Sequence, residues 1–337
     1  MVKKVRLGLV GSGIAMTKLH YPALRKLSDL FDVVAISSGH VENAEKFAST
    51  FDRDIHVFND YHHMIISGLV DAIDVAVPPQ YNFDIVQDAL RNGVHVICEK
   101  PIAENVKRGK ELIKLSESYD RIFMIAESQR YDPQLDQIND LIRIGKIGKP
   151  VMFDWNVIVN FSEDNEYVNT SWRKAPKHVG GFLSDGGVHH MAVLRAIFGE
   201  VSEVAGFVSK VNDHIGGEDT MVLNMLFENG VIGSYSVSYG LRAPAHKSLK
   251  IYGTHGKMKA TPREIEIIKE NEEIERHAAP MVNLFEEEFK EFYNAIVQGS
   301  RIQRGSPESA LKDLALIEAG IHSARIGCMV RMNEFLE

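Results

Sequence analysis

The sequence lacks the features that define several large classes of protein. It has two cysteines, Cys98 and Cys328, among 337 residues, too few for the disulfide framework of a small secreted domain. Cys98 lies within an apolar run, so we expect a buried thiol and a reducing, cytoplasmic location. The first residues lead straight into a predicted strand, and we expect no signal peptide. No stretch has the length and apolarity of a membrane span, so no membrane partner is expected.

The chain also lacks an excess of positive charge. It has 38 Lys and Arg against 46 Asp and Glu, which gives a formal net charge of −8. A nucleic-acid-binding protein would carry a basic face, so nucleic acid is not an expected partner. Hydrophobic residues make up 45% of the chain and charged residues 25%, an ordinary balance for a globular protein with a core. The length suffices for about two domains.

What the first half does contain is a regular alternation of short apolar runs and helical patterns. The apolar runs cover residues 5–10, 33–36, 73–77, 95–98 and 122–126. Strands that alternate with helices in this way are typical of βαβ units in a parallel sheet. We therefore predict that residues 1–126 form a doubly wound Rossmann domain, an α/β fold that binds dinucleotides.

A glycine turn follows the first predicted strand and opens a helix, as a dinucleotide fingerprint requires. Gly11 would permit the tight turn, and Gly13 would let backbone N–H groups approach a pyrophosphate. Met16 stands where a third glycine or alanine is usual, which predicts looser packing of the helix on the strand. Taken alone, the motif is equally consistent with a structural glycine turn. The predicted cofactor residues here are Gly11, Gly13, Ile14 and Ala15, with Pro78 after the run 73–77.

The residues after the second strand bear on the choice of cofactor. An acidic residue there would bind the ribose 2′-hydroxyl of NAD, whereas a polar pocket would accept the 2′-phosphate of NADP. The strand ends in Ser37, Ser38, Gly39 and His40, without an acid. Two hydroxyls and a histidine favour NADP and leave NAD open, and the alternative is that these are ordinary turn residues.

The second half has the pattern of a different domain. Predicted strands cover residues 151–160, 221–227, 231–237, 248–252 and 265–268, and Asn229-Gly230 suits a type I′ hairpin turn. We predict that residues 127–337 form an α+β domain with a large, open, mostly antiparallel sheet and helices on one side, ending in helices 284–297 and 307–326. Apolar residues such as Met225 and Ile232 on the outer face predict a subunit contact, in a homodimer or homotetramer.

Two motifs carry candidate chemistry. Glu99-Lys100-Pro101 ends the run 95–98, and Lys100 would polarise a substrate oxygen by its charge and hydrogen bonding. Asp185 and His189 are four residues apart on a predicted helix and would share one face, where the carboxylate would orient the imidazole as a general acid or base. Each has a plainer interpretation: Lys100 as a surface charge, Asp185 as a helix N-cap and His189 as a structural histidine. No Cys/His cluster has the spacing of a metal site.

Together these motifs resemble the Gfo/Idh/MocA family of oxidoreductases. The resemblance covers Gly11-Ser12-Gly13, Glu99-Lys100-Pro101, Trp172-Arg173 and Gly180-Gly181 followed by Asp185-x-Gly187-x-His189. It implies a Rossmann domain, a C-terminal domain whose open sheet forms the dimer contact, and Glu99 and Lys100 near the nicotinamide. It further implies that His189 is the acid or base, that Asp185 orients it, and that Arg173, with Lys100, Asp185 and His189, binds the substrate.

Three departures from the family pattern concern the substrate more than the reaction. Ala192 replaces an aspartate that often follows the histidine, Asn82 replaces a frequent histidine, and Val179 replaces the first of three glycines. The prediction is an NAD(P)-dependent oxidoreductase that transfers a hydride between nicotinamide and a sugar, polyol or related cyclic alcohol or ketone. The alternatives are a non-catalytic NAD(P)-binding sugar sensor and an NAD-dependent glycosidase.

Overall fold

The computed structural model describes residues 3–337, and the chain divides into two compact units. The first unit extends to Tyr131 and also includes Asn283–Lys312, and the second comprises Asp132–Val282 and Asp313–Glu337. The segment 283–312, placed by sequence in the C-terminal half, belongs with the first unit for a physical reason. Its helix α9 (Leu284–Gln298) packs three aromatic rings against Phe31 of strand β2 (Phe31–Ser37), namely Phe289, Phe292 and Tyr293.

The first unit contains the predicted parallel sheet. Its six strands lie in the order β3-β2-β1-β4-β5-β6, all parallel, so the order reverses between β1 and β4. Ligands of doubly wound folds bind at this reversal, beyond the carboxyl ends of the strands. Besides β2, the strands are β1 (Val5–Val10), β3 (His56–Phe58), β4 (Ala72–Val75), β5 (His95–Glu99) and β6 (Phe123–Ala126).

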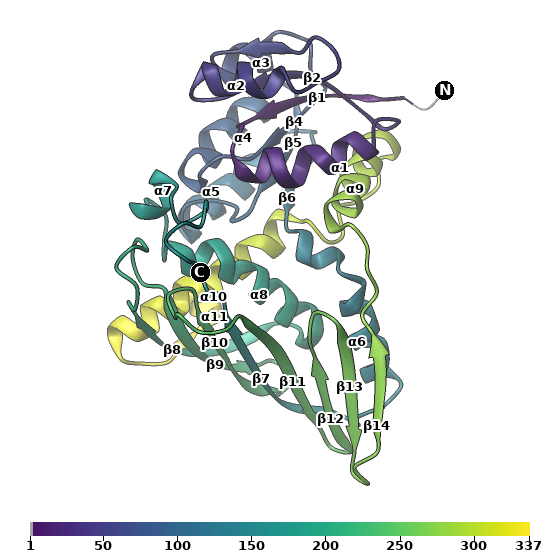
Figure 1. Cartoon of the computed structure of the whole chain (residues 1–337), viewed down its shortest axis with the longest axis vertical. Coiled ribbons are helices and arrows are strands. Elements are labelled where there is room, and N and C mark those ends of the chain that lie inside the picture. Colours follow the sequence, from purple (N-terminus) through teal and green to yellow (C-terminus); the bar gives the residue numbers. More distant parts are fainter. Residues whose placement is uncertain (1–2) are drawn as a thin grey trace. The chain divides into compact units, whose positions relative to one another are not determined.

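Helices cover this sheet. Figure 1 shows α1 (Tyr21–Lys26) near α9, and both contribute to one core with β1 and β2. Met16, at the third fingerprint position, is fully buried in that core and begins a π-helical turn, η1 (Met16–His20). Cys98 is also fully buried, as predicted, and burial raises the pKa of its thiol well above the ordinary value. The remaining helical segments are α2 (Val41–Ala48), α3 (Tyr61–Ile66), η2 (Pro79–Tyr81), α4 (Asn82–Arg91), α5 (Val106–Ser116) and η3 (Ser128–Tyr131).

The second unit is built on the predicted large sheet. Its nine strands lie in the order β14-β13-β12-β11-β7-β10-β9-β8-β15, and only the pairing of β7 with β10 is parallel. The predicted strands are confirmed as β7 (Pro150–Ile158), β9 (Thr220–Phe227), β10 (Ile232–Ser238), β11 (His246–Gly253) and β13 (Glu264–Lys269). The sequence patterns did not identify β8 (Val201–Ser209), β12 (Gly256–Ala260), β14 (Ile274–Ala278) or β15 (Val330–Arg331).

The main helix of this unit, α8 (Phe182–Phe198), lies against one face of the sheet (Figure 1). Phe198 stacks on Phe153 of β7 with ring centroids 5.2 Å apart, and His190 meets Trp155 of the same strand edge-on at 5.0 Å. These rings make the inner face of the sheet a continuous apolar layer. The other helices are α6 (Pro133–Arg143), α7 (Ser171–Lys174), α10 (Pro307–Ile326), inside which the division of the two units falls, and α11 (Met332–Leu336).

The turn between β9 and β10 differs from the predicted type. A type I′ turn needs positive φ at both central residues. Gly230 has φ of 85°, but among the described residues Glu272 is the one non-glycine residue with positive φ, so Asn229 does not meet the requirement. Gly230 N donates to Phe227 O at 2.9 Å, and Phe227 N donates to Val231 O at 2.8 Å. The hairpin is confirmed, and its type I′ turn was wrong: a longer loop closes on one left-handed glycine.

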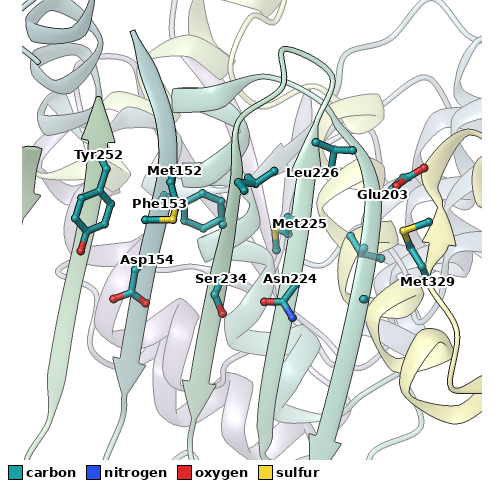
Figure 2. Close-up of a pocket in the computed structure, with 14 residues that line it drawn as sticks. Met152, Phe153, Asp154, Glu203, Asn224, Met225, Leu226, Ser234, Tyr252 and Met329 are labelled. Atoms are coloured by element: carbon teal, nitrogen blue, oxygen red, sulfur yellow. The ribbon is translucent and has the colours of Figure 1, made fainter. Parts of the chain in front are cut away.

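An apolar row crosses the outer face of this sheet, opposite α8. Strand register places Tyr252 beside Met152, Met152 beside Ile232, and Ile232 beside Leu226. Met152 is 42% exposed and Ile232 is 50% exposed. The pocket drawn in Figure 2 lies on this face, with Asp154, Ser234 and Asn224 forming a polar row next to the apolar one.

The sequence placed Met225 on this outer face, and that was wrong. Met225 is 3% exposed, and it pairs with Gly233, which in turn pairs with Phe153 of the inner layer. Successive side chains of a strand point to opposite faces, so Leu226 and not Met225 is the outward neighbour of Ile232. Met152, Ile232, Leu226 and Tyr252 form an apolar row on the outer face, and Phe207 and Met329 add further exposed apolar surface there.

Candidate active site

The two glycines of the first turn serve different purposes. Gly11 has φ of 103°, its N–H donates to Ser37 O at 2.8 Å, and an added Cβ would lie 2.3 Å from Ala76 O. Gly11 is thus required by the fold, because any side chain would strike the β4 segment. Gly13 has no positive φ, and an added Cβ would meet nothing within 4 Å. Space is therefore open beside Gly13. Ile14 and Ala15 come next in the chain, and η1 begins at Met16.

The residues predicted to distinguish NADP from NAD lie at the end of β2. Ser38 is held by Ser12, whose hydroxyl donates to the Ser38 hydroxyl at 3.0 Å, so this turn is joined to the glycine turn. His40 is exposed and is the N-cap residue of α2, while Ser37 is 2% exposed. An anion at this edge would therefore reach Ser38 and His40 before Ser37.

The Glu99-Lys100-Pro101 motif lies at the end of β5, and its backbone is held by Asn82. The Asn82 side-chain amide nitrogen donates to Glu99 O at 3.3 Å and to Pro101 O at 3.0 Å, so the two bonds flank Lys100. Asn82 is 1% exposed and begins α4 just after Pro78 and η2. Asn82 departs from the family pattern in sequence, and in the structure it contacts the motif directly.

Two further residues at this edge, His20 and Asp74, were not identified from the sequence. His20 lies between the carboxylates of Asp74 and Glu99, and both His20 and Asp74 are fully buried. A signal was present in the printed sequence: Asp74 is a charged residue inside the apolar run 72–75, and a buried carboxylate needs a partner.

The second unit holds the other predicted residues, on α7 and α8. The N-cap of α8 is Gly181, so the interpretation of Asp185 as a helix cap is wrong. Asp185 lies in the first turn of the helix, where the dipole stabilises its negative charge. Its carboxylate accepts a hydrogen bond from Arg173 Nε at 2.7 Å, and each of the two side chains is 12% exposed. The Arg173 guanidinium also lies 3.9 Å from the ring centroid of Trp172.

Adjacent histidines of α8 have different environments. His190 is 7% exposed, its Nδ1 lies 2.6 Å from Tyr235 Oη, and its ring packs on Trp155, so it belongs to the core. His189 is only partly buried and lies one helical turn after Asp185, on the same face. His189, the predicted acid or base, is therefore the more exposed of the two histidines.

A buried tyrosine lies in the electrostatic field of Asp185. Burial, and then the charge of Asp185, raise the pKa of Tyr239 well above its ordinary value. Tyr239 therefore keeps its proton at neutral pH and remains a hydrogen-bond donor. The predicted site residues thus fall into two sets: the glycine turn, Ser37, Ser38, His40, Pro78, Glu99 and Lys100 in the first unit, and Arg173, Asp185 and His189 in the second.

Among the described residues, neither a metal site nor a membrane-crossing helix is found. Between residues 3 and 337, no three His, Cys, Asp or Glu side chains gather as ligands of a metal ion would. In the same part of the chain, no helix combines the length and apolarity needed to cross a membrane.

Known proteins resemble this chain along nearly its whole length. A family model described as the NAD-binding Rossmann fold of an oxidoreductase family matches residues 5–127, and its companion, the C-terminal alpha/beta domain, matches residues 139–332. The crystal structure of an oxidoreductase from Thermotoga maritima is 42% identical in sequence, with a TM-score of 0.94, over 99% of this chain and 100% of that one.

Several relatives have named activities. A D-apiose dehydrogenase of Paraburkholderia graminis is 24% identical over 98% of this chain and 90% of its own length. The structure of levoglucosan dehydrogenase in complex with NADH and levoglucosan shares the fold, with a TM-score of 0.87 and 20% identity over 98% of this chain and 100% of its own. Because both parts of the family pattern match, and match more than half of the chain, this protein belongs to the Gfo/Idh/MocA family of oxidoreductases.

Proposed function

We propose that this protein is an NAD(P)-dependent dehydrogenase or reductase that transfers a hydride between nicotinamide and a sugar, polyol or related cyclic alcohol or ketone. The observation that carries the proposal is the edge of the parallel sheet at its reversal of strand order. There the open space at Gly13 lies after the end of β1, and Lys100 lies after the end of β5 between the two carbonyls that Asn82 binds. The sugar dehydrogenases among the relatives support the substrate class.

The proposed roles follow from the chemistry of each side chain. When bound, NAD(P) supplies the hydride acceptor or donor. Lys100 or His189 takes the proton of the substrate hydroxyl in oxidation and returns it in reduction. Asp185 orients His189 from one turn away. Arg173, already paired with Asp185, binds substrate oxygens with its remaining N–H groups.

For the cofactor itself we propose NADP in preference to NAD. Support comes from Ser38, oriented by Ser12, and from the exposed His40 at the N-terminus of α2, where a helix dipole favours an anion. Side-by-side calorimetric titrations with NADH and NADPH test this. Tighter NADPH binding is expected, and its loss in Ser38→Ala would identify the phosphate contact. Tighter NADH binding would reverse the choice and leave the enzyme proposal standing.

The substrate class is tested by turnover of a sugar panel, for which D-apiose, D-xylose, levoglucosan and myo-inositol are sensible first members. Lys100→Met is the decisive variant, with the exposed Lys107→Met as a matched control on the same unit. We expect kcat to fall by about 10²- to 10⁴-fold in Lys100→Met, the range for loss of an acid or base, with cofactor binding retained. Retained turnover would remove Lys100 from the mechanism. Cofactor binding without turnover of any sugar by the wild type would favour a sensor.

We also propose that the outer face of the nine-stranded sheet contacts a second copy of the chain, in a homodimer or homotetramer. The support is the apolar row of Tyr252, Met152, Ile232 and Leu226, in which Met152 and Ile232 are about half exposed.

A further inference from the structure

A buried imidazole links the end of β4 to the lysine motif at the end of β5. His20 is the last residue of η1 and has no exposed surface. Its Nδ1 lies 3.0 and 2.9 Å from the two carboxylate oxygens of Asp74, and its Nε2 lies 2.9 Å from Oε1 of Glu99. Asp74 is fully buried, and the Glu99 side chain is 13% exposed. The three groups therefore form a dry chain that ends one residue before Lys100.

The hydrogen-bonding capacity of these groups restricts the protonation of the ring. An ionised carboxylate only accepts hydrogen bonds, and a neutral imidazole donates from one nitrogen and accepts at the other. With a carboxylate at each nitrogen, a neutral ring would direct a lone pair at an anion. A doubly protonated ring satisfies both contacts, and charge-assisted bonds of this kind are the strong ones.

The surroundings favour the same state. Burial lowers the pKa of His20, but the charges and hydrogen bonds of Asp74 and Glu99 outweigh it, so that the net pKa lies well above the ordinary value. Phe285 and Phe289 of α9 pack against the ring at 5.7 and 5.5 Å and exclude water. The other acids facing this cluster are Glu288 of α9 and Glu127 after β6. Burial raises the pKa of Glu288 well above its usual range, which favours the protonated form of this carboxyl group.

The motif is thus held in two ways. Asn82 holds its backbone through the carbonyls of Glu99 and Pro101, and His20 holds the side chain of Glu99. η1 follows the glycine turn directly, so one short segment bears both the open space at Gly13 and the ring that orients Glu99. π-helical turns are rare and occur often at functional sites.

We propose that His20 is a positioning residue of this enzyme: held by Asp74, it orients Glu99 as an anion beside Lys100, and so sets the placement of Lys100 for proton transfer. This rests on the proposed function for the role of Lys100. The protonation and contacts of His20 do not depend on that role and are tested separately.

The first test uses the wild-type protein labelled with ¹⁵N in its histidines. Nitrogen spectra distinguish a protonated from a bare ring nitrogen. We expect one ring, that of His20, to keep protons on both nitrogens from neutral pH to well above the ordinary imidazole pKa, and its signals to shift in Glu99→Gln. A His20 ring with one bare nitrogen at neutral pH would overturn the proposal. This result is independent of any substrate or cofactor.

The second test measures catalysis with the sugar that the wild type turns over. His20→Gln is similar in size to His20 but lacks the charge, and the exposed His63→Gln is the matched control. We expect kcat to fall by about 10²-fold in His20→Gln, the cost of misplacing a catalytic group by about 1 Å, with little change in KM or in NAD(P)H affinity. If His20→Gln does not fold, Glu99→Gln takes its place. This variant keeps the imidazole, and its kcat should also fall.

The outcomes of the two tests separate the two proposals. A folded His20→Gln whose kcat equals that of wild type and of His63→Gln would overturn the positioning role. A purely structural role would lower the melting temperature and leave kcat per folded enzyme unchanged, which would also overturn it. If the wild type turns over no sugar, the proposed function fails, and the nitrogen spectra still decide the state of His20.

Discussion

At the scale of single residues, the first unit places several ionisable groups where water cannot reach them. His20, Asp74 and Glu288 are fully buried within one cluster. His20 and Asp74 bond to each other, whereas both carboxyl oxygens of Glu288 have no hydrogen-bond partner among residues 3–337. Taking an unpaired carboxylate out of water costs far more than keeping it protonated. Protonation of Glu288 is therefore linked to the stability of the folded protein.

The first prediction concerns this linkage. The pKa of Glu288 is raised in the folded state, so its contribution to stability is present below the unfolded pKa of about 4.3 and is lost as pH rises toward the folded value. Glu288→Gln removes the titration. We expect the variant to melt above wild type at pH 8, by about 2 to 4 °C for each kcal/mol, and close to wild type at pH 4.

Differential scanning calorimetry across this pH range makes the measurement. Glu117→Gln, an exposed glutamate of the same unit, controls for the loss of a carboxyl group. A Glu288→Gln variant that is less stable than wild type at pH 8 would mean that Glu288 is ionised and paired in the folded protein.

At the scale of elements, the segment from the end of β1 through η1 combines a glycine that the fold requires with open space at Gly13. Gly11 satisfies the turn, Gly13 leaves space, and Met16 fills the core where a small residue is usual. Because the first helical turn is a π turn, His20 reaches β4 and β5 from the same segment. Local chain geometry thus connects the proposed cofactor contact with the proposed catalytic lysine.

The second prediction separates the two glycines. Gly13→Ala adds a methyl group where the fold has room, so the melting temperature should stay near wild type. The same methyl would occupy the approach to a pyrophosphate, and we expect NADPH affinity to fall by about tenfold or more, which is about 1.4 kcal/mol. Calorimetric titration measures the affinity.

Gly11→Ala is the matched comparison at this turn. Its Cβ would lie 2.3 Å from Ala76 O in a left-handed backbone conformation, so we expect a loss of stability of at least about 1 kcal/mol. Unchanged NADPH affinity in a folded Gly13→Ala would show that the cofactor does not approach this turn.

At the scale of the whole molecule, the nine-stranded sheet has two unlike faces. The inner face buries Phe153 and Trp155 under α8, and the outer face carries half-exposed apolar side chains in a row. An exposed apolar row of this kind is stabilised when a second surface covers it. The proposed subunit contact therefore involves this sheet face.

The third prediction tests that assembly. Ile232→Glu places a charge in the centre of the apolar row, and we expect the oligomer seen by light scattering coupled to size exclusion to shift toward monomer. Ile66→Glu is the control, because Ile66 is 52% exposed on the first unit, similar to the 50% of Ile232. An assembly equally insensitive to both substitutions would place the subunit contact elsewhere.

The sequence by itself determined the fold class, the glycine turn and most strands, because their signals are local: apolar runs, glycine positions and the four-residue spacing of Asp185 and His189. Predictions of this kind need no knowledge of which segments meet. Only the tertiary structure decided the rest. It brought α9 to the first unit, moved Met225 to the inner face, and joined His20, Asp74, Asn82 and Glu99, which lie up to 79 positions apart in the sequence. Partners so distant in the chain are selected by packing and by the need of buried charges for one another, and neither leaves a local pattern.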